Sequence, residues 1–289
     1  MKRGGNMKVP SRHPLRALLL FAALCALFAA CGSSATPAAS TTPTAAAAPV
    51  TLNVFAAASL TESFNEIKAK YQEAHPNITL TYNFNGSQIL VQQMINGAAA
   101  DIFVSADQTN MKKAVDADLV ANSQIFVRNK LAVIIPANNP GNITSLKDLA
   151  RKGVKLVLAA PAVPVGKYSL QVLDKLSKSP DYGSSYAGNV KANVVSQEEN
   201  VKAVVQKVQL GVADAGIVYK TDVTAAIADK VKFIEIPDQF NVIAEYPIAV
   251  TKKAPHPAEA QAFVQYLLSP EGQAIMSKYR FISPTGSGA

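Results

Sequence analysis

The sequence is poor in the residues that enzymes use most often for nucleophilic and metal chemistry, with two cysteines and three histidines among 289 residues. Both cysteines lie in the first 31 residues, and they cannot make a zinc site. His13 lies in the same segment, while His75 and His256 each adjoin proline, where a solvated or helix-capping role is expected. The motifs G-x-S-x-G, H-E-x-x-H, Walker A and G-x-G-x-x-G are also absent. We therefore predict no catalytic residue and no cofactor, since a hydrolase or transferase would need a nucleophile beside a base.

Positive charge is concentrated at the N-terminus. The formal net charge is +8. Five basic residues precede the first long apolar run: Lys2, Arg3, Lys8, Arg12 and Arg16. Without these five charges the net charge falls to +3, and the rest of the chain has no stripe of Lys and Arg. Nucleic acid is therefore not an expected partner.

The apolar run from Leu18 to Ala30 follows this basic segment and predicts an export signal. It ends in L-F-A-A-C-G-S-S, which resembles a bacterial lipoprotein signal, so we predict a signal peptide over 1–30 and lipidation of Cys31. An uncleaved anchor or an ordinary secretory signal is the alternative. Residues 31–49 are almost wholly Ala, Thr, Ser, Pro and Gly and predict a flexible tether. The folded part would then contain no thiol, and its stability would come from a conventional core.

Strand and helix signals alternate from Val50 onward, which favours an α/β fold with parallel strands covered by helices. Strands are expected at 52–55, 78–84, 101–105, 125–135, 154–159, 190–195, 215–219, 231–236 and 246–250. Helices are expected at 60–74, 87–96, 108–118, 168–176, 198–210, 257–268 and 270–279, with a short one between Thr144 and Gly153.

Two long β-rich stretches, 125–135 and 242–250, lie where the chain could pass between two lobes. We therefore predict a discontinuous first lobe of 50–126 plus 245–285 and a second lobe of 127–244.

Four helices are expected to begin directly after a strand or a small-residue loop. Ser59 with Glu62 has the spacing of a capping box, and Ser87 opens the second such helix. V-P-V-G-K-Y (163–168) and E-E-N-V-K (198–202) open the other two. Helix N-termini that meet at the carboxyl ends of strands can bind an anion. Each serine alone could equally be an ordinary N-cap, and only the set favours an anion site.

Five motifs resemble those of the molybdate-binding proteins of bacterial ABC importers. They are F-A-A-A-S-L (55–60), F-N-G-S-Q-I-L (84–90), A-D-I-F-V-S-A-D-Q (100–108), V-P-V-G-K-Y (163–168) and A-G-I-V-Y (215–219). The segment 245–273 is similar to type II solute-binding proteins more broadly. The resemblance implies the two-lobed type II fold, in which each lobe has a mainly parallel sheet flanked by helices, with a hinge between them. A tetrahedral dianion would be held between the lobes.

The resemblance also implies five ligand-binding positions, all of them neutral hydrogen-bond donors. Ser59 and Ser87 would donate through hydroxyl and amide groups, Val165 and Val201 through their amides, and Tyr219 through its phenol. Molybdenum would be held only as part of the oxyanion, with no direct metal ligand. Because molybdate carries no proton, a carboxylate acceptor would only repel it. Lys167, the nearest basic residue, could be a solvated lysine or a guide at the pocket entrance.

The implied function is an extracytoplasmic receptor that captures molybdate, and also tungstate, for an ABC permease and its ATPase. It would act as a monomer anchored to the cell membrane through Cys31, in the periplasm if the host has an outer membrane. The alternatives are a receptor for sulfate, phosphate or a small organic anion, an enzyme, and a surface adhesion protein without a ligand.

Overall fold

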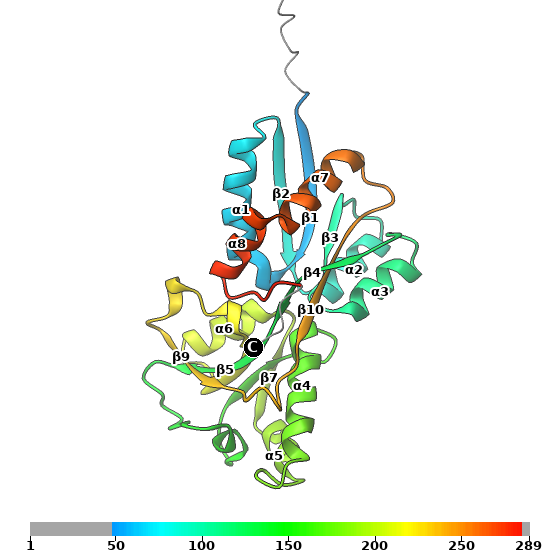
Figure 1. Cartoon of the computed structure of the whole chain (residues 1–289). Coiled ribbons are helices and arrows are strands. Elements are labelled where there is room, and N and C mark those ends of the chain that lie inside the picture. The colour runs from blue at the N-terminus through cyan, green and yellow to red at the C-terminus, as the bar shows by residue number, and fades with distance from the viewer. Residues whose placement is uncertain (1–47, 285–289) are drawn as a thin grey trace, which may run out of the picture. The chain divides into compact units, whose positions relative to one another are not determined.

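The structure is a computed structural model in which residues 48–284 are described. These residues belong to one compact unit and build two five-stranded sheets, each flanked by its own helices (Figure 1). The predicted signal peptide (1–30), Cys31 and most of the predicted tether (31–49) lie outside the described residues. Within 48–284, no helix is both long enough and apolar enough to cross a membrane.

The first sheet has the strand order β2-β1-β3-β10-β4. Its strands are β1 (Val50–Ala57), β2 (Ile78–Asn85), β3 (Ile102–Val104), β4 (Gln124–Asn129) and β10 (Ala244–Val250). Strand β1 pairs in parallel with β2 and β3, whereas β10 pairs antiparallel with β3 and β4. The helices of this first lobe are α1 (Thr61–Ala74), α2 (Ser87–Ile95), α3 (Gln108–Asp116), α7 (Pro257–Leu268) and α8 (Pro270–Lys278).

The second half of strand β1, V-F-A-A, is buried on both faces, which explains its continuous apolar sequence, whereas Thr51 in the first half is exposed. Val54 packs in a core that includes Phe64 of α1 and Phe263 of α7. Its neighbour Phe55 belongs to a separate core with Leu90 of α2, because successive side chains of a strand point to opposite faces. Figure 1 shows α1, α7 and α8 on one side of the sheet and α2 and α3 on the other. The parallel strands β1, β2 and β3 therefore end at one edge between two helical layers.

The second sheet has the order β7-β6-β8-β5-β9. Its strands are β5 (Leu131–Pro136), β6 (Leu156–Ala159), β7 (Val194–Glu198), β8 (Ala215–Tyr219) and β9 (Val231–Glu235). Strand β6 pairs in parallel with β7 and β8, and β5 pairs antiparallel with β8 and β9. The helices of this second lobe are α4 (Pro164–Ser177), α5 (Tyr186–Ala192) and α6 (Val201–Gln209), with short 3-10 helices η2 (Leu146–Ala150), η3 (Lys220–Asp222) and η4 (Ala225–Ile227).

The predicted fold class is confirmed, with one refinement: both sheets are mixed, because β4, β5, β9 and β10 pair antiparallel with their neighbours. The β-rich stretch expected at 125–135 is two strands in two different sheets, with Lys130 between them. The chain returns to the first sheet with β10. The lobe bounds drawn from the sequence, 50–126 plus 245–285 and 127–244, remain predictions.

The strand expected at 190–195 is wrong. This segment contains the end of helix α5, and strand β7 begins only at Val194. Tyr186 and Val190 are both buried, and their spacing of four residues places them on one face of a helix. The Tyr186 hydroxyl also donates a hydrogen bond to the Leu146 carbonyl oxygen. Packing against η2 therefore makes this segment helical, although Val190, Ala192 and Val194 alternate as strand residues do.

Candidate functional site

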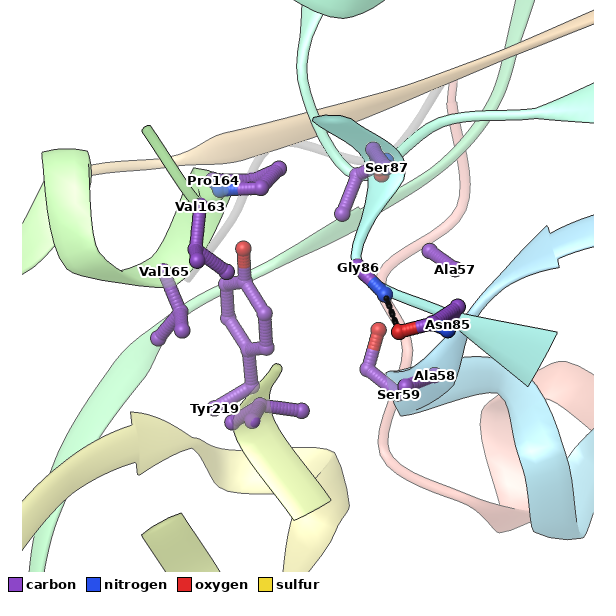
Figure 2. A pocket seen from close by; sticks show the side chains of 12 residues that line it. Ala57, Ala58, Ser59, Asn85, Gly86, Ser87, Val163, Pro164, Val165 and Tyr219 are labelled. Carbon is purple, nitrogen blue, oxygen red and sulfur yellow. Dashed lines mark hydrogen bonds between the residues drawn. The ribbon is translucent and has the colours of Figure 1, made fainter. Parts of the chain in front are cut away.

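A small pocket lies between segments of the two lobes and has about 210 Å³ of empty space (Figure 2). The first lobe lines it with Ala57, Ala58, Ser59, Asn85, Gly86, Ser87 and Ala106. The second lobe lines it with Val163, Pro164, Val165, Val201 and Tyr219. All five ligand positions expected from the sequence are thus brought together in one pocket. The figure of about 210 Å³ includes open solvent, and the enclosed space for the centre of a water-sized sphere is only about 10 Å³. This is far below the roughly 300–1,000 Å³ of sites for drug-sized molecules, so the space suits a small ion.

The ends of the strands position the first-lobe wall. Strands β1, β2 and β3 are parallel, so the segments that follow them emerge at the same edge of the sheet. Ser59 follows β1 in the 3-10 helix η1 (Ala58–Leu60), Ser87 opens α2 after β2, and Ala106 follows β3. The sheet topology therefore places three chain segments around one point.

The starts of helices α4 and α6 position the second-lobe wall. Val165 is the second residue of α4, and Val201 is the first residue of α6. Backbone N–H groups in the first turn of a helix have no acceptor within that helix, so both amides suit an anion. Gly166 makes the α4 wall possible, because a Cβ atom there would lie 2.2 Å from the Ala160 carbonyl oxygen. Asn200 caps α6 by accepting a hydrogen bond from the Ala203 amide at 3.0 Å.

The capping box expected from Ser59 and Glu62 is wrong. Helix α1 begins at Thr61 with Leu60 as its N-cap, and within the described residues no side chain caps it. The Ser59 Oγ atom instead lies 2.9 Å from the Tyr246 hydroxyl oxygen, and Glu62 pairs with Lys202. Because η1 comes between β1 and α1, Ser59 stands two residues before the helix and its hydroxyl is used elsewhere.

The alternative of an ordinary N-cap also fails for Ser87. It is the first residue of α2, and Gly86 occupies the N-cap position. The Ser87 Oγ atom accepts a hydrogen bond from the Ala106 amide at 2.9 Å. Both pocket serines are buried, with 3% exposure for Ser59 and 1% for Ser87. Each hydroxyl is therefore held by a partner outside its own helix.

The Tyr219 hydroxyl is the most distinctive polar group of the pocket. It is buried, and within residues 48–284 it has no hydrogen-bond partner. Figure 2 shows it between Val163 and Pro164 on one side and Gly86 and Ser87 on the other. Burial raises the pKa of this phenol well above its usual value, so it stays neutral and can donate. An unpaired buried hydroxyl costs about 1–3 kcal/mol, a penalty that an acceptor bound in the pocket would remove.

The twelve residues that line the pocket include no charged side chain. Nearby charges are paired: Lys167 Nζ lies 3.3 Å from Asp107 Oδ2 and also contacts Thr109. Lys167 belongs to the second lobe and both partners to the first, so it joins the lobes and is not a merely solvated lysine. The amide nitrogen of the Gln88 side chain also joins them, because it donates to the Glu199 carbonyl oxygen at 2.8 Å.

The described part of the chain holds no cluster of three or more His, Cys, Asp or Glu residues suited to a metal ion. His75 stacks on Tyr71, with ring centroids 4.3 Å apart, and His256 precedes helix α7. Neither histidine lines the pocket.

Several pocket residues were not singled out from the sequence, although motifs contained them. Asn85 and Gly86 lie in F-N-G-S-Q, and Ala106 in V-S-A-D-Q. Tyr246, which contacts Ser59, lies in the segment E-Y-P-I. Local spacing carried no signal for these roles, because each depends on contacts between distant segments.

Comparison with known proteins agrees with this geometry. The family model for bacterial extracellular solute-binding proteins matches residues 52–282. The molybdate-binding protein ModA of Mycobacterium bovis is 34% identical over 232 residues, which cover 80% of this chain and 84% of that protein.

Two solved structures share the fold. The sulfate-binding protein SubI of Mycobacterium tuberculosis has a TM-score of 0.72 at 17% identity, covering 82% of this chain and 88% of that one. The periplasmic molybdate-binding protein of Azotobacter vinelandii has a TM-score of 0.69 at 21% identity, covering 81% of this chain and all of that one.

The resemblance to molybdate-binding proteins of ABC importers that the motifs indicated is thus confirmed. Proteins of this family bind solutes for ABC transporters and are not enzymes, which also confirms the prediction of a non-enzymatic chain. By the family match and the identity to a curated relative, the chain belongs to the bacterial extracellular solute-binding proteins.

Proposed function

We propose that this protein captures molybdate, and also tungstate, between its two lobes. The observation that carries the proposal is that five neutral donors from both lobes line one small pocket without a charged side chain. The buried Tyr219 hydroxyl, which lacks a hydrogen-bond partner among the described residues, supports a ligand that accepts hydrogen bonds. A dianion without a proton needs only donors, and neutral donors avoid the repulsion of a carboxylate.

The proposed ligand contacts come from three hydroxyls and the starts of three helices. Ser59, Ser87 and Tyr219 would donate through side chains, and the amides of Ser87, Val165 and Val201 would donate at the N-termini of α2, α4 and α6. The macrodipole of each helix adds partial positive charge at its N-terminus. Several weak dipoles would therefore stabilise the negative charge of the ligand together.

Titration calorimetry of the purified protein with molybdate, tungstate, sulfate and phosphate tests the proposal. We expect the first two anions to bind more tightly than sulfate and phosphate. The same anions should raise the unfolding temperature in that order, because a ligand that binds only the folded state stabilises it. Absence of binding by all four anions would overturn the proposal.

Sulfate is the second candidate. A donor-only pocket suits it as well, since sulfate carries no proton at neutral pH, and the sulfate-binding SubI structure shares the fold. The two ligands differ in size, so the anion that fills the pocket best should bind most tightly. Sulfate binding stronger than molybdate binding would replace the first proposal by the second.

Delivery to an ABC permease and its ATPase, attachment through a lipid on Cys31 and a monomeric state belong to the same proposal. The match to bacterial extracellular solute-binding proteins supports an extracytoplasmic location. Cell fractionation of the full-length chain and of a Cys31→Ser variant tests the anchor. We expect the unchanged chain in the membrane fraction and the variant in the soluble fraction, and equal distribution would exclude lipid anchoring.

A further inference from the structure

A buried chain of hydrogen bonds leads from the pocket to the place where the polypeptide passes between the sheets. Ser59 Oγ lies 2.9 Å from the Tyr246 hydroxyl oxygen. Asn129 Nδ2 lies 3.3 Å from that same oxygen and 2.8 Å from Thr221 Oγ1. All four side chains are at most 4% exposed. They come from η1, β10, β4 and η3, so the chain of bonds links both lobes.

The direction of each bond follows from Asn129. Its Oδ1 atom accepts a hydrogen bond from the Lys130 amide at 2.9 Å, and a backbone amide can only donate. This contact identifies the other atom of the carboxamide as Nδ2, which also can only donate. The Tyr246 oxygen therefore accepts from Asn129. Either hydroxyl could donate in the Ser59–Tyr246 contact, but if Ser59 donated, the hydrogen of the fully buried Tyr246 would have no acceptor among the hydrogen bonds of residues 48–284. Donation from Tyr246 to Ser59 is therefore the favoured direction.

In this direction Ser59 keeps its own hydrogen for the pocket. With Tyr246 as the donor of the 2.9 Å contact, the Ser59 Oγ atom accepts and the Ser59 hydrogen stays free for a ligand. Burial raises the pKa of Tyr246 far above its usual value, so the phenol keeps the proton that this direction requires.

The side-chain oxygen atoms of two other polar residues of the pocket, Ser87 and Asn85, also accept hydrogen bonds from backbone amides. Ser87 Oγ accepts from the Ala106 amide at 2.9 Å, so its hydrogen also remains for a ligand. Asn85 Oδ1 is occupied as an acceptor by the Gly86 amide at 2.8 Å (Figure 2). A ligand that carries a proton needs an acceptor, whereas both pocket serines keep their hydrogens for a ligand while their oxygens accept from Tyr246 and from the Ala106 amide.

We propose that Tyr246, oriented by Asn129, is a positioning residue that fixes Ser59 as a hydrogen-bond donor and makes the pocket select fully deprotonated oxyanions over protonated ones. The proposal rests on oxyanion binding at this pocket, as proposed above. Tyr246 acts through Ser59 and does not line the pocket itself. Monohydrogen phosphate is the informative competitor, because it has the charge and tetrahedral shape of molybdate but carries one proton.

The decisive experiment compares calorimetric affinities for molybdate and phosphate in the unchanged protein, Tyr246→Phe and a Tyr71→Phe control at pH 8. Tyr71 is a buried tyrosine of the same lobe, at 2% exposure, outside the pocket. Without Tyr246 the Ser59 hydroxyl can turn and accept the phosphate proton. We expect Tyr246→Phe to weaken molybdate binding about three- to tenfold and to lower the preference for molybdate over phosphate at least about fivefold. Tyr71→Phe should leave the preference unchanged.

Asn129→Asp supplies a second test with nearly the same shape. A carboxylate would accept the Tyr246 hydrogen, so the Tyr246 oxygen would accept from Ser59 and Ser59 would accept from the ligand. The added charge repels molybdate and monohydrogen phosphate alike. The ratio of their two affinities therefore reports only the direction of the hydrogen bond between Ser59 and the ligand. We expect the preference for molybdate to fall further than in Tyr246→Phe, and this variant serves where Tyr246→Phe does not fold.

The outcomes separate this inference from the proposed function. If the unchanged protein binds oxyanions and the folded variants keep the same preference for molybdate over phosphate, the role of Tyr246 is overturned and the proposed function stands. Absence of oxyanion binding by the unchanged protein would overturn both proposals.

Discussion

Lys202 Nζ lies 2.7 Å from Glu62 Oε2, so helix α6 of the second lobe is joined to helix α1 of the first. The same ammonium lies 3.3 Å from Asp222 Oδ1, whose side chain has no exposed surface. Burial lowers the pKa of Lys202, but the attraction of Asp222 and Glu62 outweighs it and leaves the pKa above its usual value. Lys202 therefore pairs with two carboxylates: Asp222, which is buried in its own lobe, and Glu62, which belongs to the other lobe.

The two contacts of Lys202 are predicted to differ in their effect on stability. Lys202→Gln leaves Asp222 buried without its cation, and we expect it to lower the free energy of unfolding by about 2–3 kcal/mol. This is less than the 3–5 kcal/mol of a fully buried pair because the Lys202 side chain is 27% exposed. Glu62→Gln keeps the Asp222 contact and should cost less than about 1 kcal/mol. Urea unfolding measures both values, and equal losses would contradict this assignment.

Glu62→Gln is also predicted to weaken ligand binding, because it removes a contact that joins the two lobes that line the pocket. Calorimetry with molybdate measures the change, which we expect to be about two- to fivefold. Glu73→Gln is a suitable control, since Glu73 pairs with Lys70 of its own helix. Equal affinity in Glu62→Gln and the unchanged protein would show that this contact between the lobes does not contribute to binding.

Replacement of either pocket serine by alanine is predicted to weaken oxyanion binding without unfolding the protein. Ser59→Ala and Ser87→Ala each remove one hydrogen bond to a charged ligand, which is worth about 1.5–3 kcal/mol. Ser63→Ala is the matched control, because Ser63 is a buried serine whose hydroxyl donates to the Leu60 carbonyl oxygen at 3.1 Å, outside the pocket. Calorimetry measures the three affinities. Unchanged affinity in both pocket variants would exclude the proposed contacts.

Tyr219→Phe is predicted to change stability and binding in opposite directions. In the free protein the variant removes a buried hydroxyl that lacks a partner among residues 48–284, so the free energy of unfolding should rise by up to about 1 kcal/mol. In the complex it removes a donor, and molybdate affinity should fall by about 1.5–3 kcal/mol. Chemical unfolding without ligand and calorimetry with ligand measure the two effects. A loss of stability together with unchanged affinity would contradict the role of this hydroxyl.

Acid is predicted to destabilise the first lobe through Glu66. Hydrogen bonds from Lys278 and Tyr279, at 2.7 and 2.8 Å, hold the pKa of Glu66 below its usual value of 4.5. A carboxylate with a lowered folded-state pKa stabilises the protein above its unfolded value, and that stabilisation is lost as the pH falls through the folded value. The unfolding temperature should therefore decrease as the pH falls below 4.5. Glu66→Gln should flatten this dependence of the unfolding temperature on pH. If the unfolding temperature of the variant falls with pH as in the unchanged protein, groups other than Glu66 cause the loss of stability.

Much of the fold could be predicted because its determinants are local. The 3.6-residue spacing of Phe64, Ile67 and Tyr71 is sufficient for α1, and the alternation of apolar residues is sufficient for β2. The same rule fails at α5, where Val190, Ala192 and Val194 alternate but packing against η2 decides the conformation. Periodicity alone is therefore not decisive in this short segment, because Tyr186 and Val190 fit a helix while Val190, Ala192 and Val194 fit a strand.

The site shows the same division between local and distant determinants. The motifs and the resemblance they carry were sufficient to select Ser59, Ser87, Val165, Val201 and Tyr219, which the structure brings into one pocket. The α/β class follows from short contiguous segments of the sequence. The export signal and the five ligand positions implied by the resemblance depend on equally short segments and remain predictions.

The partners of the pocket side chains could be seen only in the folded structure. The partners Ser59–Tyr246, Ser87–Ala106 and Lys202–Glu62 are 187, 19 and 140 residues apart in sequence. The expectation that Ser59 caps its helix was wrong because capping is judged from neighbours three residues away, whereas its actual partner comes from β10. Hydrogen-bond direction and charge pairing depend on atoms that meet only after folding, so neither the Ser59–Tyr246 contact nor the Lys202–Glu62 pair could be predicted from local spacing.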